Sequence, residues 1–287
     1  MKYLNSDKID TCLFLSIQYT MTQDTGKFRM NLKDQFYTSP KVAQNCVETI
    51  VDKCPQTSSY LWIEPSAGNG AFLHAIPTNF NKIGLDLEPK AEDILLQDYL
   101  TWTPPARECI VFGNPPFGRQ SSLAKSFISK SEYASIIAFI LPKSFTKPSM
   151  FNAFGKKFHL IHSIELENNS FLRNNQPYNV PCVFQIWVKR ETDRPIEKKI
   201  QPVGFRYVKT DYHFAIRRVG GLAGKAYPNN GHPYSVQSHY FVVLDVPGSI
   251  DTLLEKINAH TFPSNTVGPR SLSKGEINRV LNVLLSV

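Results

Sequence analysis

The sequence predicts an α/β fold, in which a sheet carries helices on both faces and is followed by a small C-terminal α+β segment. From Leu61 to about residue 190, short apolar runs typical of strands alternate with stretches of helical spacing. Beyond the highly charged run at 189–199, the composition changes to a basic, glycine-broken hairpin signal, one further strand and two short helices. Alternating strand and helix signals favour a parallel sheet flanked by helices.

The individual elements follow from spacing and from turn residues. A helix is predicted at 40–51, where apolar side chains recur at helical spacing and Pro40 occupies the start, a position that favours proline. Strands are predicted at 61–63, 83–86, 110–112, 136–141, 160–164 and 183–188, and a second helix at 122–131. The C-terminal segment is predicted to contain a hairpin at 214–227, a strand at 240–244 and helices at 250–259 and 273–285.

The first predicted strand leads into a glycine-containing segment. Glu64 begins this segment, and Gly68 and Gly70 follow in the sequence EPSAGNG. A Gly-x-Gly turn between a strand and a helix places backbone N–H groups around a ligand. The third glycine of the dinucleotide fingerprint is absent, which disfavours NAD.

Two acidic residues follow later apolar runs. Asp86 ends the strand at 83–86, and Asp98 comes after the apolar residues 95–96. A carboxylate at the end of the second strand suits the two hydroxyls of a ribose. Each acid alone could be a solvated strand end, but their order and spacing after the glycine segment favour a ligand-binding interpretation.

The segment Asn114-Pro115-Pro116-Phe117 directly follows the strand at 110–112 and points to chemistry on an amino group. The side-chain carbonyl of Asn114 can accept one amino hydrogen, and the carbonyl of Pro115 can accept the other. Proline has a fixed φ and no N–H, so the loop is rigid. Phe117 offers a flat face on which a base can stack. The alternative interpretation is a proline-rich turn that ends a strand.

Together, these motifs resemble those of class I S-adenosylmethionine-dependent methyltransferases of the adenine-N6 kind. The similarity is to DNA methyltransferases in which the cofactor motifs precede the catalytic motif, and it spans roughly residues 33–190. The resemblance implies a Rossmann-like methyltransferase sheet, S-adenosylmethionine as cofactor, and direct methyl transfer to the exocyclic N6 amine of adenine.

The resemblance also assigns roles to single residues. The implied cofactor-binding residues are Tyr37, Thr38, Glu64, Ser66, Ala67, Gly68, Gly70, Asp86, Asp98 and Tyr99. Among them, Glu64 faces the amino-acid end of the cofactor, Asp86 binds the ribose, and Asp98 accepts from the adenine amino group, with the ring of Tyr99 beside it. The implied catalytic residues are Asn114, Pro115, Pro116 and Phe117, and Phe171 is the implied second stacking ring of the target-base pocket.

The implied substrate is nucleic acid, with DNA favoured over RNA. The formal net charge of +8 and the isoelectric point of about 9.1 suit a polyanionic partner. Three alternatives stay open: an RNA methyltransferase acting on adenine N6 or guanine N2, a protein-glutamine methyltransferase, and a catalytically idle binding module with the same fold. The presence of Asn114, Asp86 and Glu64 speaks against the idle module.

The expected domains are an N-terminal extension at 1–30, a catalytic domain at 31–190, a linker at 191–204 and a basic substrate-binding segment at 205–287. In the last segment, Arg217, Arg218 and Lys225 are expected to contact phosphates. The five cysteines are scattered and form no Cys-x-x-Cys motif, which predicts neither a zinc site nor a disulfide framework. With no signal peptide or membrane span in the sequence, we expect an intracellular protein in the cytoplasm or nucleus.

Overall fold

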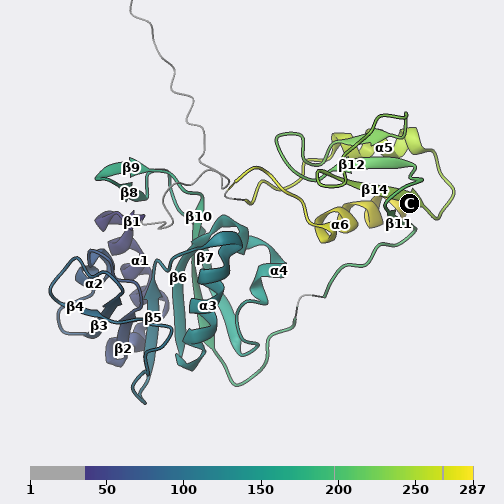
Figure 1. The fold of residues 1–287 in the computed structure, drawn as a ribbon. Helices are drawn as coiled ribbons and strands as arrows, with labels where there is room; N and C mark the ends of the chain where they lie inside the picture. Colours follow the sequence, from purple (N-terminus) through teal and green to yellow (C-terminus); the bar gives the residue numbers. More distant parts are fainter. Residues whose placement is uncertain (1–35, 197, 267, 287) are drawn as a thin grey trace, which may run out of the picture. The chain divides into compact units, whose positions relative to one another are not determined.

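A computed structural model describes residues 36–196, 198–266 and 268–286 of the chain. The N-terminal extension expected at 1–30 lies outside the described residues. The described residues contain one seven-stranded sheet, a three-stranded sheet and a four-stranded sheet (Figure 1). The expected domain boundaries remain a prediction.

The seven-stranded sheet has the order β4-β3-β2-β5-β6-β10-β7. Its strands are β2 (Leu61–Glu64), β3 (Asn81–Asp86), β4 (Ile94–Leu96), β5 (Cys109–Gly113), β6 (Ile136–Pro142), β7 (Phe158–Glu165) and β10 (Cys182–Lys189). The five strands from β4 to β6 in this order run parallel, but β10 is antiparallel to both β6 and β7. The sheet is therefore mixed, and the prediction of a parallel sheet was wrong for β10. The connection from β7 to β10 contains a hairpin in place of a crossover helix, so β10 returns beside β7 in the opposite direction.

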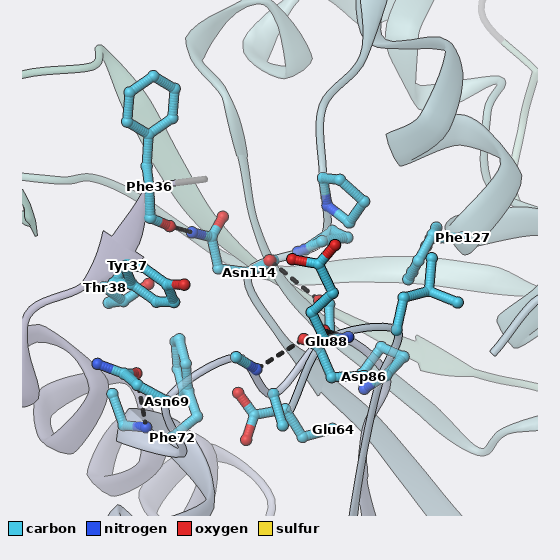
Figure 2. Close-up of a pocket in the computed structure, with 18 of the residues that line it drawn as sticks. Phe36, Tyr37, Thr38, Glu64, Asn69, Phe72, Asp86, Glu88, Asn114 and Phe127 are labelled. Atoms are coloured by element: carbon cyan, nitrogen blue, oxygen red, sulfur yellow. Dashed lines mark hydrogen bonds between the residues drawn. The ribbon is translucent and has the colours of Figure 1, made fainter. Parts of the chain in front are cut away.

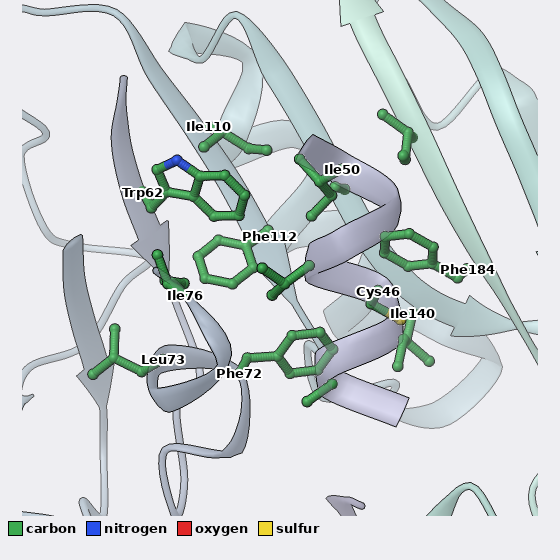
Figure 3. Packing of buried hydrophobic residues seen from close by; sticks show 14 of the residues in the cluster. Cys46, Ile50, Trp62, Phe72, Leu73, Ile76, Ile110, Phe112, Ile140 and Phe184 are labelled. Atoms are coloured by element: carbon green, nitrogen blue, oxygen red, sulfur yellow. The ribbon is translucent and has the colours of Figure 1, made fainter. Parts of the chain in front are cut away.

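Helices cover both faces of this sheet, as predicted. Helices α1 (Pro40–Lys53) and α2 (Ala71–Ala75) pack on one face, and α3 (Ser122–Lys130) and α4 (Pro148–Phe151) pack on the other. Alternate residues of β6 serve the two cores: Ile140 belongs to the first, and Phe139 belongs to the second. In the first core, the buried face of α1 meets aromatic rings of the sheet (Figure 3).

The three-stranded sheet joins segments that are far apart in the chain. It contains β1 (Tyr37–Thr38), β8 (Phe171–Arg173) and β9 (Gln176–Tyr178), in the order β1-β8-β9. Asn174 and Asn175 connect β8 to β9 and have φ values of 51° and 59°, as the two-residue turn of a tight hairpin requires. Thr38 pairs with Phe171 in this sheet, so the residues just before α1 are fixed by main-chain hydrogen bonds.

The C-terminal part has its own antiparallel sheet and its own hydrophobic core. The strands β11 (Phe205–Val208), β14 (His239–Leu244), β12 (Phe214–Arg217) and β13 (Ala226–Pro228) are neighbours in that order. Helices α5 (Ile250–Ala259) and α6 (Lys274–Leu285) pack against one face of this sheet. The pairing of β12 with β13 confirms the predicted hairpin, and the combination confirms a small α+β segment.

Short 3₁₀ turns complete the described elements: η1 (Pro55–Ser59), η2 (Arg119–Ser121), η3 (Ser131–Tyr133) and η4 (Lys143–Thr146). The described residues of the expected linker at 191–204 form neither helix nor strand. Of the helices in the described part of the chain, none has the length and apolar character needed to cross a membrane.

Candidate active site

A cavity of about 370 Å³ lies at the carboxyl ends of β2, β3 and β5. β2 stands between β3 and β5, and the chain moves outward through β3 and β4 before it returns to β5 on the other side. In open α/β sheets, ligands bind at this reversal of strand order. The volume falls within the range of roughly 300–1,000 Å³ that is typical of small-molecule sites.

Most of the residues predicted from the sequence meet at this cavity (Figure 2). Its walls include Tyr37, Thr38, Glu64, Ser66, Ala67, Gly68, Asp86, Asn114, Pro115, Pro116 and Phe117. They come from β1, from the loop after β2, from the end of β3 and from the loop after β5. The structure therefore brings together the segments that resemble cofactor motifs and the segment that resembles a catalytic motif.

The loop after β2 is held in place by its glycines and by Asp86. Gly68 has a φ of +54°, and a Cβ there would lie 3.0 Å from the Tyr37 ring. Its N–H donates to Asp86 Oδ2 at 2.7 Å, and the N–H of Glu88 donates to Asp86 Oδ1 at 2.7 Å. Each carboxylate oxygen keeps a second lone pair. Asp86 can therefore accept further hydrogen bonds, such as those from two neighbouring hydroxyl groups.

Glu64 presents an unusual carboxyl group to the cavity. Its side chain is only 2% exposed, and Oε2 is buried with no hydrogen-bond partner among the described residues. Burial raises the pKa of Glu64 well above its usual range, and the nearby Asp86 and Asp93 raise it further, against a backbone hydrogen bond from Leu73. Gly113 makes room for this side chain, because a Cβ there would lie 3.2 Å from Glu64 Cγ. A cationic ligand group would satisfy this carboxyl and favour its charged form.

Asn114 is fixed in an orientation that leaves its acceptor available. The side-chain Nδ2 donates to the carbonyl of Phe36 at 3.4 Å, and Ser66 Oγ donates to the Asn114 main-chain carbonyl at 3.1 Å. Because a carbonyl only accepts, the amide nitrogen must face Phe36, and Oδ1 turns the other way. This Oδ1 is buried and has no partner in the described part of the chain. It is an acceptor that awaits a donor.

Thr38 adds a third unsatisfied polar atom at the same cavity. Its side chain is 4% exposed, and its buried Oγ1 is without a hydrogen-bond partner among residues 36–196, 198–266 and 268–286. Buried polar atoms are nearly always paired in folded proteins. The gathering of Thr38 Oγ1, Glu64 Oε2 and Asn114 Oδ1 around one cavity therefore indicates a site built for a polar ligand.

Three of the predicted cofactor-binding residues, Gly70, Asp98 and Tyr99, do not line the cavity. Gly70 has a left-handed backbone conformation at the start of α2, and a Cβ at this position would lie 2.5 Å from the His74 ring. Asp98 instead accepts from the Leu100 N–H at 2.9 Å, across a local turn. Tyr99 is 1% exposed, and its hydroxyl lies 2.7 Å from Ser131 Oγ. Both Asp98 and Tyr99 are therefore engaged within the fold instead of at the cavity wall.

Phe171 is also placed away from the cavity. It is 1% exposed and belongs to the core beneath α1, because alternation along β8 turns its ring inward. The expectation that Phe171 is a stacking ring is therefore corrected: a ring buried in this core has no free face for a base.

The cavity also has walls to which the sequence motifs assign no individual role. These are Phe36, Pro65, Asn69, Ala71, Phe72, Leu87, Glu88, Gly118, Leu123 and Phe127. Leu123 and Phe127 lie four residues apart on α3, so they share one helix face. Leu87 follows Asp86 directly and is 66% exposed, which is unusual for a leucine at the end of a buried strand. The position next to the acid was a signal for Leu87, whereas helical spacing shows only that Leu123 and Phe127 share a face and not that this face meets the cavity.

The predicted basic residues are all in the C-terminal part, outside the cavity. Arg217 Nε donates to the Val219 carbonyl at 3.1 Å, and Lys225 is exposed. The guanidinium of Arg218 lies 5.1 Å from the centre of the Tyr240 ring. Arg217 pairs with His239 of β14, whereas Arg218 lies over Tyr240, the next residue of β14, which points to the opposite face, so the two arginines do not share one surface.

Comparisons with known proteins give partial matches to solved structures. No family model matches the sequence. A candidate RNA methyltransferase from Pyrococcus horikoshii is 15% identical, with a TM-score of 0.44, over 57% of this chain and 92% of that chain. A candidate class I S-adenosylmethionine-dependent methyltransferase from Listeria monocytogenes is 15% identical, with a TM-score of 0.41, over 60% of this chain and 65% of that one. A type I restriction-modification methyltransferase subunit from Streptococcus thermophilus is 17% identical, with a TM-score of 0.41, over 55% and 45%. The sheet order and the helices on both faces make this chain a Rossmann-like α/β protein.

Proposed function

We propose that the protein is an S-adenosylmethionine-dependent methyltransferase that methylates the exocyclic N6 amine of adenine in nucleic acid, with DNA as the favoured substrate. The observation that carries this proposal is the orientation of Asn114. Its amide is held by the Phe36 carbonyl, while its buried Oδ1 is unpaired at the cavity in the described structure. An oriented, unpaired acceptor at the end of β5 suits an amino group that must be held and activated.

The residues around the cavity fit the proposed cofactor. S-adenosylmethionine carries an ammonium, a carboxylate, a ribose and an adenine, and when bound it supplies an electrophilic methyl group. Glu64, with its unsatisfied Oε2, suits the ammonium, and the Thr38 hydroxyl suits the carboxylate. Asp86 has lone pairs left for ribose hydroxyls.

The side chains of Leu87 and Phe127 provide apolar surface for the adenine of the cofactor. They take the part that the resemblance gives to Asp98 and Tyr99, which do not line the cavity. We therefore propose that the cofactor's adenine is held by shape and apolar contact from these two side chains.

The acceptor amine is activated by hydrogen bonding in this proposal. The lone pair of an exocyclic amine is delocalised into the base, which makes the nitrogen a poor nucleophile. If Asn114 Oδ1 accepts one N–H and the Pro115 carbonyl accepts the other, the lone pair becomes available for attack. When bound, S-adenosylmethionine would supply the methyl group, Asn114 and Pro115 would hold the amine during the transfer, and the displaced amino proton would pass to solvent. These contacts act by positioning and by preorganised electrostatics.

Phe117 completes the proposed acceptor site. Its half-buried ring lines the cavity beside the two prolines. Stacking on this ring would offset part of the cost of removing a base from a duplex, which is roughly a few kcal/mol. We also propose that basic residues of the C-terminal part bind the nucleic-acid backbone.

The test is product analysis with the full-length chain. The protein is incubated with methyl-labelled S-adenosylmethionine and panels of DNA, RNA and protein, and the products are hydrolysed and identified by mass spectrometry. We expect label in N6-methyladenine, with DNA as the better substrate. Label in N2-methylguanine, N4-methylcytosine or methylglutamine would overturn the proposed acceptor, and no transfer to any panel would overturn the proposed activity.

A further inference from the structure

The C-terminal sheet has two faces of different character. Residues Phe214, Ile216 and Val242 point toward α5 and α6 and belong to the core there. Alternation along the strands turns Arg217, Tyr227, His239 and Phe241 to the opposite face. We call this opposite surface the aromatic face, and it consists of Tyr212, Arg217, Lys225, Tyr227, His232, Tyr234, His239 and Phe241.

The rings of the aromatic face form a layer made of two groups of contacting rings. Tyr212 stacks on Phe241 with ring centres 4.6 Å apart and planes inclined by 21°. Tyr234 lies 5.4 Å from Tyr227 and 4.8 Å from His239. Phe241 and His239 are buried beneath, whereas the three tyrosines are half-buried and keep part of each ring in contact with solvent. The layer therefore presents several partly accessible rings side by side.

Positive charge accompanies these rings. Arg217 lies opposite His239 in the pairing of β12 with β14, and Lys225 is exposed two residues before Tyr227. Arg206, on the same side of the neighbouring strand, forms an ion pair with Asp245. The exposed Asp211 next to Tyr212 is hydrogen-bonded to Thr210. The face thus combines aromatic surface with two cations placed close to the rings.

The other face of the sheet uses its cations differently. Arg218 lies over the Tyr240 ring at 5.1 Å, and Lys274 Nζ lies over the Tyr207 ring at 4.4 Å. Tyr207 in turn donates from its hydroxyl to Asn278 Oδ1 at 2.7 Å. These charges and rings contact each other within the fold. Arg218 is therefore a natural control for Arg217, since the two arginines are adjacent in sequence and sit on opposite faces.

We propose that the aromatic face binds single-stranded nucleic acid, with unpaired bases stacking on Tyr212, Tyr227 and Tyr234 and with Arg217 and Lys225 near the phosphates. Aromatic platforms beside positive charge are the recurring means of binding unpaired strands, because every base has a flat face to stack. In a duplex, the flat faces of the bases are stacked on one another and are not accessible to tyrosine rings. The inference rests on the proposed function, because a methyltransferase acting on nucleic acid gives this face its ligand.

The test is fluorescence anisotropy with the full chain. Labelled single-stranded DNA and RNA oligonucleotides of mixed sequence are compared with a duplex of equal length. We expect the single strands to bind more tightly than the duplex. Tyr227→Ala and Tyr234→Ala should each weaken single-strand binding by about fivefold to a hundredfold, whereas Tyr227→Phe and Tyr234→Phe, which keep the rings, should bind like the parent.

The arginine pair provides the matched comparison. Arg217→Ala and Lys225→Ala should each reduce the slope of log affinity against log salt by about 0.7 for a lost phosphate contact, and Arg218→Ala should leave it unchanged. Equal effects at Arg217 and Arg218, unchanged binding in both alanine variants of the tyrosines, or preference for the duplex would overturn the proposal. Lys225 is exposed, so its variant keeps the test valid if a tyrosine variant fails to fold.

Failure of this inference and failure of the proposed function are distinguishable. Cofactor binding by calorimetry and methyl transfer are measured on the same variants. Normal methyl transfer with undiminished oligonucleotide binding in the tyrosine and arginine variants overturns only the assignment of the aromatic face. Absence of cofactor binding and transfer, with ring-dependent binding of single strands, overturns only the methyltransferase.

Discussion

At the carboxyl edge of the seven-stranded sheet, three buried polar atoms are unpaired in the described structure, whereas no atom of the aromatic face belongs to that class. In the aromatic face, the buried His239 has its Nδ1 at 2.9 Å from Ser238 Oγ, and the accessible surface of this face consists of rings and two cations. The first region is organised for oriented polar contacts that a ligand must complete. The aromatic face offers contact area that would accept strands of many different nucleotide sequences. A chemical step needs the first kind of surface, and retention of a long polymer needs the second.

The largest effect is expected at Asn114, where the first region is most specialised. Asn114→Ala removes the oriented acceptor, and loss of one preorganised contact to a reacting group typically lowers turnover by about a hundredfold to a thousandfold. Cofactor affinity should stay near that of the parent, because the cofactor is proposed to contact other loops. Single-turnover methyl transfer and calorimetry measure the two quantities separately.

Asn114→Asp is the informative companion. It keeps an acceptor but loses the N–H that the Phe36 carbonyl holds. Its turnover should therefore fall between those of the parent and the alanine variant. Parent-like turnover in Asn114→Ala would show that the unpaired Oδ1 has no part in the reaction.

Asp86 should show the next largest effect, on cofactor binding. Asp86→Ala removes proposed ribose contacts and also the acceptor of the Gly68 N–H, so we expect a loss of about 1–3 kcal/mol in binding free energy. Asp93→Ala is the control, because Asp93 is a half-exposed carboxylate nearby that contacts His74 and does not line the cavity. Calorimetry should show weaker binding for the first variant only. Equal affinity in both variants would remove Asp86 from the cofactor site.

Glu64 makes the first region sensitive to pH. Its folded-state pKa is raised by burial, so the folded state holds this proton more tightly than the unfolded chain does. Stability should therefore fall as pH rises from the ordinary carboxyl pKa toward the raised one. Glu64→Gln should remove this slope and raise the free energy of unfolding above that pH window by about 1–3 kcal/mol. Denaturant unfolding at several pH values measures the effect, and an identical slope in parent and variant would contradict it.

The same group should couple cofactor binding to proton release. A bound ammonium favours the carboxylate, so affinity should increase with pH across the range where Glu64 is protonated in the free protein. Calorimetry in two buffers of different ionisation enthalpy counts the protons released. Cofactor binding to the Glu64→Gln variant should release fewer protons, since the glutamine side chain does not titrate.

The sequence identified the parts of the site that depend on local chain geometry. Glu64 and Asn114 each stand where a buried strand ends, and parallel neighbours bring such ends together. Leu123 and Phe127 reach the cavity only because of how α3 packs on the sheet, and the local sequence motif does not indicate this tertiary packing. The same holds for β10, whose antiparallel direction depends on how the chain returns from the β8–β9 hairpin.

The C-terminal part gives the same lesson for a surface. A run such as Arg217-Arg218 looks like one basic patch in sequence. In the structure, Arg217 pairs with His239 on the aromatic face, whereas Arg218, the residue after β12, lies over Tyr240 on the side of the helices. Composition indicated the charge, whereas strand geometry decides which charge is available to a ligand.

The smallest effect is expected at Tyr99, which the resemblance places beside the cofactor and the structure places in the second core. Burial raises the pKa of Tyr99 to about 12, against hydrogen bonds to Ser131 and Tyr133, so its hydroxyl is neutral at physiological pH. Tyr99→Phe should lower the free energy of unfolding by about 1 kcal/mol, because Ser131 loses a partner at 2.7 Å. Cofactor affinity should not change. Tyr133→Phe, which removes the longer contact of 3.2 Å, should cost less. Weaker cofactor binding in Tyr99→Phe with unchanged stability would return this ring to the site, and the wall formed by Leu87 and Phe127 would then be the wrong assignment for the adenine.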